Sequence, residues 1–404
     1  MKGRSMSPRY RFDRLELAGS LGDLGTLLPI AIGMILINGL HPSGLFFVVG
    51  LYFILSGFYF GVTVPVQPMK VIGAYAIATA MTAGQIQASG LLIGLFLLIL
   101  GLTGAITFIG KYIPRPVVRG VQLSTGTLLM AQGVRFIMGT SRFQALRHAA
   151  EPFLTFQSLG PLPVGILIGV AGSVVTLLLL ENRRFPAGLL IVLAGFGLGA
   201  AFGTHEGFGD LRIGINLPAI LPFGIPGGAD FTFALLALVL PQIPMTLGNA
   251  VVAYADLSKE YFGEESRKVT YRASCISMGL ANLLSALVGG MPLCHGAGGL
   301  AAHYRFGART AGSNMVIGLL FLALAVLFGT HSLAIVYLIP MSILGVLLLF
   351  AGSQLALTVI DIRERKDLFV VLVMLGITLA SNLAAGFIVG IGVAYALKSE
   401  RLNV

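Results

Sequence analysis

The 404-residue sequence predicts an all-α polytopic membrane protein with about fourteen transmembrane segments, arranged as two inverted repeats of about seven each. Hydrophobic residues make up 56% of the chain and charged residues 10%, whereas a soluble protein carries roughly a quarter charged residues. Apolar runs such as 91–109 and 162–180 can cross the roughly 30 Å hydrocarbon core as helices. A β-barrel would show short alternating segments instead, so the helical class is favoured.

Apolar length places the transmembrane segments along the chain, and Pro, Gly and charged residues mark their ends. The segments are 15–37, 44–62, 67–84, 87–109, 116–138, 162–180, 186–203, 231–254, 269–289, 294–303, 312–329, 333–354, 368–383 and 385–397. Residues 1–14 form a basic tail without the cleavage site of a signal peptide. The Gly- and Pro-rich connector 204–230 joins the first repeat, 15–203, to the second, 231–397. An odd number of spans in each half gives the halves opposite orientations, a pattern typical of secondary transporters.

Lysine and arginine in the short loops predict the orientation of the chain in a plasma membrane. With a cytoplasmic N-terminus, the inside loops hold Lys2, Arg4, Arg9, Arg11, Arg14, Lys111, Arg115, Arg183, Arg184, Lys259, Arg267, Lys268, Arg272, Arg305, Arg309, Arg363, Arg365, Lys366, Lys398 and Arg401. Both termini are therefore expected in the cytoplasm. Arg135, Arg142 and Arg147 break the pattern, and we assign them to an external amphipathic segment.

The net charge of +10 is carried mostly by these loops, so membrane lipid and anionic solutes are the predicted partners and nucleic acid is not. Cys275 and Cys294 form neither a CxxC pair nor a Cys/His ligand set, so no disulfide, metal site or cofactor is predicted. An enzyme is not predicted either, because His205 and Glu206 lack the HExxH spacing and no nucleophile elbow is present.

Two stretches interrupt the apolar pattern at matching places, the third span of each half. They read VTVPVQPMKVIGAYA at 62–76 and GGMPLCHGAGGLAAHY at 289–304. Proline lacks a backbone N–H and restricts the residue before it, so helices should begin near Pro68 and near His295 or Gly296. Broken backbone at membrane depth is tolerated where it lines a cavity. Two helix N-termini that face one cavity would suit a small tetrahedral oxyanion, because they offer free N–H groups and partial positive charge.

Polar and small residues beside these breaks are candidates for binding such an ion. Gln67 and His295 could donate side-chain hydrogen bonds. Three glycines would let the backbone approach a ligand closely: Gly296, Gly298 and Gly299. Structural alternatives stay open, since the glycines could pack helices, His295 could be a hydrogen-bonded core histidine, and Cys294 fits packing.

The first and eighth spans also carry polar residues at membrane depth. Asp23 lies well inside the first span, where an ionisable residue is by default a functional hypothesis. It either takes up a proton with the cargo or hydrogen-bonds backbone freed at a half-helix end. In the eighth span, three neutral side chains could hydrogen-bond a ligand without the cost of a charge: Gln242, Thr246 and Asn249. Lys70, after Pro68, either faces the cavity or reaches the membrane interface.

Four motifs resemble the molybdate transporter family, a branch related to the sulfate permeases. They are GDLGT at 22–26, PVQPMK at 65–70, PRPVVRGVQLS at 114–124 and PLCHGAGGLAAHYRFGART at 292–310. The resemblance runs over nearly the whole chain. It implies the uracil permease type of fold, in which a core of spans 1–4 and 8–11 moves against a gate of spans 5–7 and 12–14. It also implies substrate contacts at the starts of the third and tenth helices: Gln67, Pro68, Met69, His295, Gly296 and Ala297.

The resemblance implies a secondary active transporter of molybdate or a similar oxyanion, and we expect no STAS domain of the kind that many sulfate permeases carry. The residues alone do not separate molybdate from sulfate, and a sulfate transporter, a nucleobase permease or an anion channel of the same fold is an alternative. A nucleobase permease would usually need a carboxylate in the eighth span, where Gln242, Thr246 and Asn249 stand. A homodimer is left open.

Overall fold

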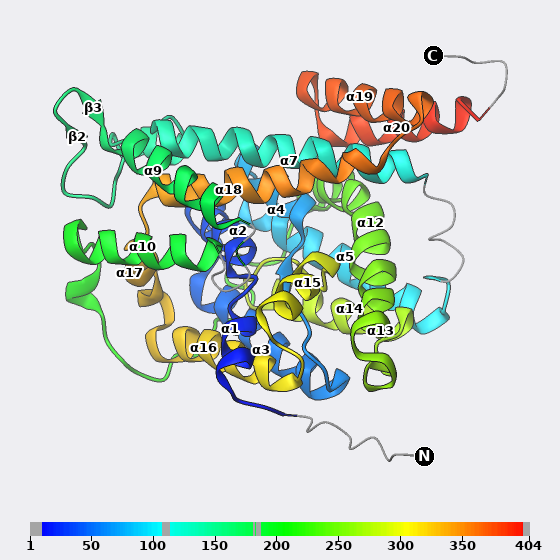
Figure 1. Cartoon of the computed structure of the whole chain (residues 1–404), viewed down its shortest axis with the longest axis horizontal. Coiled ribbons are helices and arrows are strands. Elements are labelled where there is room, and N and C mark those ends of the chain that lie inside the picture. The colour runs from blue at the N-terminus through cyan, green and yellow to red at the C-terminus, as the bar shows by residue number, and fades with distance from the viewer. Residues whose placement is uncertain (1–9, 107–113, 181, 183–186, 399–404) are drawn as a thin grey trace.

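The computed structural model describes residues 10–106, 114–180, 182 and 187–398. Most of the predicted tail 1–14 lies outside these ranges, as do the loop cations Lys2, Arg4, Arg9, Lys111, Arg183, Arg184 and Arg401. Helices dominate the described secondary structure (Figure 1). Among the described residues, 6 helices are long and apolar enough to cross a membrane, and shorter apolar helices accompany them. The protein is therefore a multi-pass helical membrane protein.

Helices of the first half follow the predicted order. They are α1 (Arg14–Ser20), α2 (Leu24–Asn38), α3 (Pro42–Phe60), α4 (Lys70–Thr79), α5 (Ala83–Thr103), α7 (Arg115–Met138), α8 (Arg142–Leu146), α9 (Val164–Leu179) and α10 (Ala187–Phe202). The first predicted span is interrupted, because α1 ends at Ser20 and α2 begins at Leu24. The third helix begins at Lys70, close to the predicted start near Pro68, because Gln67 and Pro68 form strand β1 (Gln67–Pro68).

The second half contains α11 (Gly228–Phe233), α12 (Leu240–Met245), α13 (Tyr254–Phe262), α14 (Tyr271–Leu287), α15 (Ala297–Phe306), α16 (Ala311–Phe328), α17 (Ser332–Val336), α18 (Met341–Ala356), α19 (Arg365–Ala380) and α20 (Leu383–Ala396). π-Helical turns join α11 to α12 and α12 to α13, where Pro241 and Pro244 cannot donate α-helical hydrogen bonds. The predicted span 333–354 is wrong as one helix: Pro340 separates α17 from α18.

Short elements complete the fold. Strand β4 (Leu293–Cys294) pairs with β1, and β2 (Ser158–Leu159) pairs with β3 (Leu162–Pro163). Turns of 3₁₀-helix lie at Phe208–Asp210, Gly263–Ser266, Gly329–His331 and Leu357–Asp361. The tenth helix begins at Ala297, after β4, and so starts slightly later than the residues His295 and Gly296 named from the sequence.

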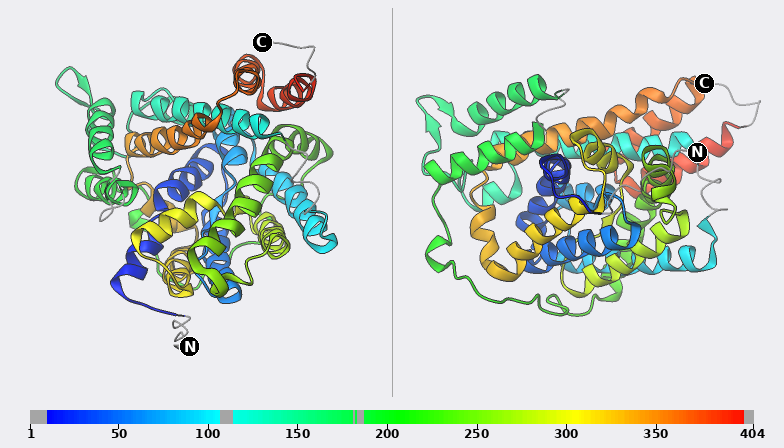
Figure 2. Two further views of the ribbon diagram at one scale, coloured as in Figure 1. Left: turned by 45° about the vertical axis from the view of Figure 1, so that its right-hand side comes forward. Right: turned by 60° about the horizontal axis from the view of Figure 1, so that its bottom comes forward.

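Helices pack in pairs through glycines that face each other's backbone. In the α7–α18 pair, a Cβ atom on Gly126 would lie 2.5 Å from the carbonyl oxygen of Gly352, and one on Gly352 would lie 2.6 Å from that of Gly126. Such contacts require glycine and hold membrane helices close together. The cyan-green α7 and the orange α18 stay side by side when the molecule is turned (Figure 2).

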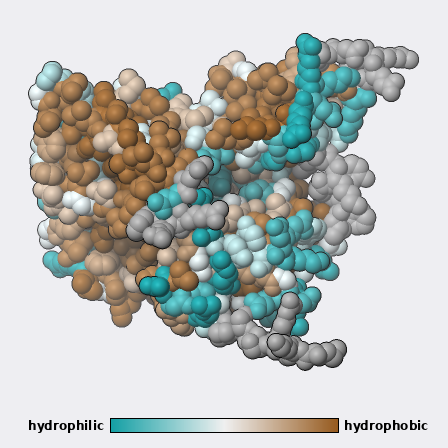
Figure 3. Space-filling view, viewed as in Figure 1, coloured by the Kyte–Doolittle hydropathy of each residue, from teal (hydrophilic) through white to brown (hydrophobic). Residues whose placement is uncertain are grey.

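Apolar side chains cover the outside of the helices. In Figure 3 they dominate the left part of the view, over α9 and α10 of Figure 1. Exposed residues of this kind include Val170, Val174 and Leu178 on α9 and Leu193 on α10. A surface of this kind suits lipid chains rather than water.

Arg142 begins the short helix α8, and Arg147 beside it forms an ion pair with Glu206 at 3.0 Å.

Glu151, in the connection between α8 and α9, caps the start of α18. It is fully buried, and its two carboxylate oxygens accept hydrogen bonds from the backbone N–H groups of Ser342 (2.8 Å) and Met341 (2.9 Å). These N–H groups have no partner within their own helix. Burial raises the pKa of Glu151 to about 7, although the bonds to Ser342 and Met341 oppose the shift.

We expect the folded protein to lose stability as the pH rises through about 7, and Glu151→Gln to remove this loss. A carboxyl whose pKa is raised in the folded state binds its proton more tightly there, so its contribution is complete below the unfolded value of 4.5 and disappears above about 7. The loss is on the order of 3 kcal/mol. Thermal unfolding in detergent at about pH 5 and pH 8 measures it, and equal pH dependence in both proteins would contradict the prediction.

Candidate functional site

The two breaks meet in a two-residue antiparallel ladder. Gln67 pairs with Cys294 and Pro68 with Leu293, and the N–H of Met69 donates to the carbonyl of Pro292 at 2.8 Å. The extended conformation predicted around the prolines is therefore present in both halves. Because α4 follows β1 and α15 follows β4 within three residues, the ladder brings the N-termini of both helices to one place.

The N-terminus of α15 is open. Its N-cap residue is Gly296, which has no side chain that could cap the helix. The carbonyl oxygen of Gly296 accepts the first helical hydrogen bond, from the N–H of Leu300 at 3.0 Å. The N–H groups of the first turn therefore lack helical partners and carry the positive end of the helix dipole. Gly298 is exposed, and a Cβ atom built on it would have no neighbour closer than 4.0 Å.

Lys70 lies opposite this open turn. It is the first residue of α4, it is half-buried, and its Nζ is the atom 4.0 Å from the Cβ position of Gly298. Of the two placements left open by the sequence, the structure selects the one that faces α15. In the ranges that the structure covers, Lys70 forms no ion pair within 4.0 Å. We call the backbone of 296–299 together with the side chain of Lys70 the cradle.

Asp23 and Gln67 border the cradle from the side of the first span. Nε2 of Gln67 donates to Oδ2 of Asp23 at 2.5 Å, and both residues are buried. A Cβ atom on Gly299 would lie 2.8 Å from each of these two polar atoms, so this position requires glycine. Asp23 is the N-cap residue of α2, yet its side chain caps no backbone N–H there. It binds Gln67 of the third span instead.

The eighth span contributes two different arrangements. Oε1 of Gln242 accepts from the N–H groups of Val71 (3.1 Å) and Ile72 (3.3 Å), and its Nε2 donates to Thr246 Oγ1 at 2.9 Å. Gln242 therefore caps α4 while Thr246 holds its amide in place, and the two helix N-termini are not equivalent. Nδ2 of Asn249 lies 3.7 Å from the Cβ position of Gly296, so Asn249 faces the cradle.

His295 lies outside the cradle, in the arrangement of a hydrogen-bonded core histidine that the sequence had left open beside that of a ligand donor. Nδ1 contacts the carbonyl of Pro65 at 2.9 Å, and Nε2 contacts Tyr52 Oη at 2.7 Å and Ser277 Oγ at 3.1 Å. The ring is fully buried and packs against Tyr52 and Tyr254. Nδ1 thus joins the two breaks, and Nε2 joins the second break to α3 and α14. No sequence pattern predicts these partners, because they come from distant spans.

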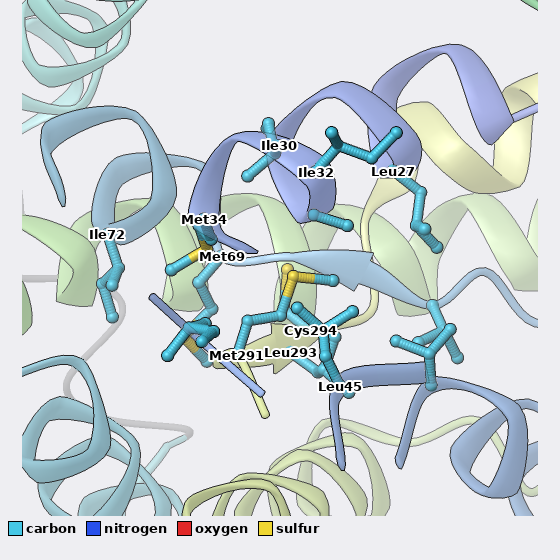
Figure 4. Packing of buried hydrophobic residues seen from close by; sticks show 14 of the residues in the cluster. Leu27, Ile30, Ile32, Met34, Leu45, Met69, Ile72, Met291, Leu293 and Cys294 are labelled. Carbon is cyan, nitrogen blue, oxygen red and sulfur yellow. The ribbon is translucent and has the colours of Figure 1, made fainter. Parts of the chain in front are cut away.

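Met69 and Cys294 also turn their side chains into the core. Figure 4 shows both among buried apolar residues such as Leu45 and Met291. The Cys294 thiol contacts the carbonyl of Pro68 at 3.8 Å. Among the residues named from the sequence, some therefore form the cradle and others border it. Lys70, Gly296, Ala297 and Gly298 form it, and Asp23, Gln67 and Asn249 lie beside it. Pro68, Met69, Cys294, His295, Gln242 and Thr246 stand behind it.

Two half-helices that meet end to end inside a helical membrane protein place the chain in a fold class that solved membrane transporters share. The transmembrane domain of the cyanobacterial bicarbonate transporter BicA superposes with a TM-score of 0.63 at 17% identity, covering 95% of this chain and 98% of that one. Murine Slc26a9, an anion transporter, superposes with a TM-score of 0.67 at 14% identity, covering 97% and 70%. At such identities the likeness concerns the fold.

The chain belongs to the family described as "Molybdate transporter of MFS superfamily", whose model matches residues 15–129 and 234–355. It is 34% identical over 417 residues to Molybdate transporter 2 of Arabidopsis thaliana, with 96% of this chain and 88% of the relative covered. It is 30% identical to Molybdate transporter 1 of Chlamydomonas reinhardtii, with 94% and 90% covered. A probable sulfate transporter of Mycobacterium tuberculosis is 24% identical, with 80% and 58% covered.

Proposed function

We propose that this protein is a secondary active transporter that carries molybdate across the plasma membrane, with both termini in the cytoplasm. The observation that carries the proposal is the open N-terminus of α15 facing the ammonium group of Lys70. Free N–H groups, a helix dipole and a cation together suit a small oxyanion. Molybdate is proposed as this oxyanion because the relatives are named molybdate transporters.

Helix packing supports about seven plus seven spans in inverted repeats. A two-fold operation that exchanges the halves maps the α7–α18 pair onto itself and exchanges the α3–α16 pair with the α14–α5 pair. Each pair has facing glycines: Gly50 lies against the carbonyl of Gly318 (2.7 Å from its Cβ position), and Gly94 against that of Gly279 (3.1 Å). The family model also matches one segment on each side of the connector 204–230.

In this proposal, α1–α5 and α11–α16 form a core that carries the anion, and α7–α10 and α17–α20 form the gate. Alternating access moves the core against the gate around the bound ion. The cradle lies within this core, since Lys70 is the first residue of α4 and 296–299 are the N-cap and first turn of α15. Asp23, which borders the cradle, is the N-cap residue of α2. The site can therefore travel as a unit without losing its own contacts.

Charge in the cradle favours transport of the anion together with a proton. Lys70 supplies one positive charge, and an ionised Asp23 nearby offsets it. A dianion that leaves water needs more compensation than the helix dipole alone provides. Protonation of Asp23 leaves Lys70 uncompensated and so strengthens the attraction. We therefore assign Asp23 as the coupling residue.

Sulfate is the second candidate substrate, because distant relatives include a probable sulfate transporter. Purified protein in proteoliposomes is expected to take up labelled molybdate saturably, faster with an inward proton gradient, and excess sulfate is expected to compete weakly. Strong competition by sulfate would make sulfate, rather than molybdate, the preferred substrate. No uptake of either ion, with or without the gradient, would overturn the proposal.

A further inference from the structure

The nitrogen and the oxygen of the Gln67 side-chain amide have different surroundings. Its side chain is buried, and Nε2 donates to Asp23 at 2.5 Å. Its Oε1 is buried without a hydrogen-bond partner among the described residues. A Cβ atom on Gly296 would lie 1.9 Å from this oxygen, so Oε1 sits directly against the N-cap of α15.

This orientation is unfavourable for an anion. A buried carbonyl oxygen without a donor costs free energy, and here its negative end faces the place where an oxyanion would bind. The ionised carboxylate of Asp23 enforces the orientation, because it can only accept and therefore takes the NH₂ group. Half a turn about the Cγ–Cδ bond would exchange Nε2 and Oε1 within nearly the same volume.

We propose that Gln67 links the proton on Asp23 to the anion by this half turn of its amide. When Asp23 takes up a proton, its new O–H donates to Oε1 of Gln67. Nε2 then points to the cradle and donates to the oxyanion. Loss of the proton reverses the turn and places Oε1 against the anion again. The inference rests on the proposed function and adds the physical contact through which proton and anion act on each other.

Other groups near Asp23 do not replace this link. The titratable groups that face it are Lys70 from α4 and Cys294 from β4. In the described part of the chain Lys70 forms no ion pair with Asp23 within 4.0 Å, and Cys294 packs in the apolar cluster. From α15, the nearest approach is the backbone at Gly299. Gln67 is therefore the side chain that touches Asp23 on one end and the cradle on the other.

Equilibrium dialysis of the full chain in detergent with labelled molybdate, at about pH 6 and pH 8, tests the inference. Wild type should bind at least about tenfold more tightly at the lower pH, as expected for one hydrogen bond to a charged group. Asp23→Asn should bind at both pH values as tightly as wild type does at the lower one. The reason is that the asparagine NH₂ donates to Oε1 of Gln67 and holds the turned state.

Gln67→Met, which keeps the side-chain length, should bind weakly and keep only the smaller pH dependence that the charge of Asp23 exerts through Lys70. Gln87→Met is the matched control. Gln87 is also buried, donates to the carbonyl of Ala286 at 3.1 Å and has an unpartnered Oε1 in the described part of the chain. We expect it to retain wild-type binding.

Full pH dependence in Gln67→Met would overturn the inference while leaving the proposed function intact, because the charge of Asp23 would then act alone. Weak binding by Asp23→Asn at both pH values would also overturn it. Absence of molybdate binding by wild type at either pH would remove the proposed function, and the inference with it.

Discussion

Replacing Gly298 by leucine is expected to abolish molybdate binding in a protein that still folds. A Cβ atom at Gly298 has no neighbour closer than Lys70 Nζ at 4.0 Å, so the backbone and core tolerate a side chain there. The leucine instead fills the space in front of the free N–H groups of α15 and separates them from Lys70. Equilibrium dialysis with labelled molybdate measures the loss, and thermal unfolding verifies the fold.

Gly376→Leu on α19 is the matched control, because a Cβ atom at Gly376 also meets nothing within 4 Å. It should bind normally. Changes at Gly296 or Gly299 are less informative, since any side chain there collides with Gln67. Wild-type affinity in Gly298→Leu would show that the anion does not bind at the start of α15.

Replacing Lys70 by methionine should weaken molybdate binding by roughly 10- to 100-fold, the range expected for hydrogen bonds to a charged group. Methionine keeps much of the apolar stem and removes the ammonium group that faces Gly298. Lys70→Arg keeps the charge with a different donor geometry, so we expect it to retain part of the affinity.

The same dialysis measures this series, with Lys259→Met as the control. Lys259 is an exposed cation in the last turn of α13, away from the cradle. If binding depended only on the net charge of the protein, Lys70→Met and Lys259→Met would have equal and small effects. Such a result would place the anion elsewhere.

Apolar length and proline positions were enough to predict much of the fold from the sequence. Apolar length predicted helices that the structure contains, among them α3, α5, α7 and α16. Pro65, Pro68 and Pro292 predicted the two breaks, because a missing N–H and a fixed φ act on the chain's immediate neighbours. The same argument missed the break at Pro340 within the predicted span 333–354.

Side-chain direction was decided only by the tertiary structure. His295 and Gln67 both lie beside a break and both carry donors, so the sequence treated them alike. The structure turns His295 toward Pro65 and Tyr52, and it places Gln67 between Asp23 and Gly296.

The physical reason is that these partners come from spans far away in the sequence, several of them in the other half of the chain. Lys70 faces α15 because the β1–β4 ladder fixes how the two broken spans meet. Gln242 caps α4 because the eighth span packs beside the third. Hydropathy and proline by themselves determined a membrane protein with two matched breaks; the contacts between its spans decided which residues face the cradle.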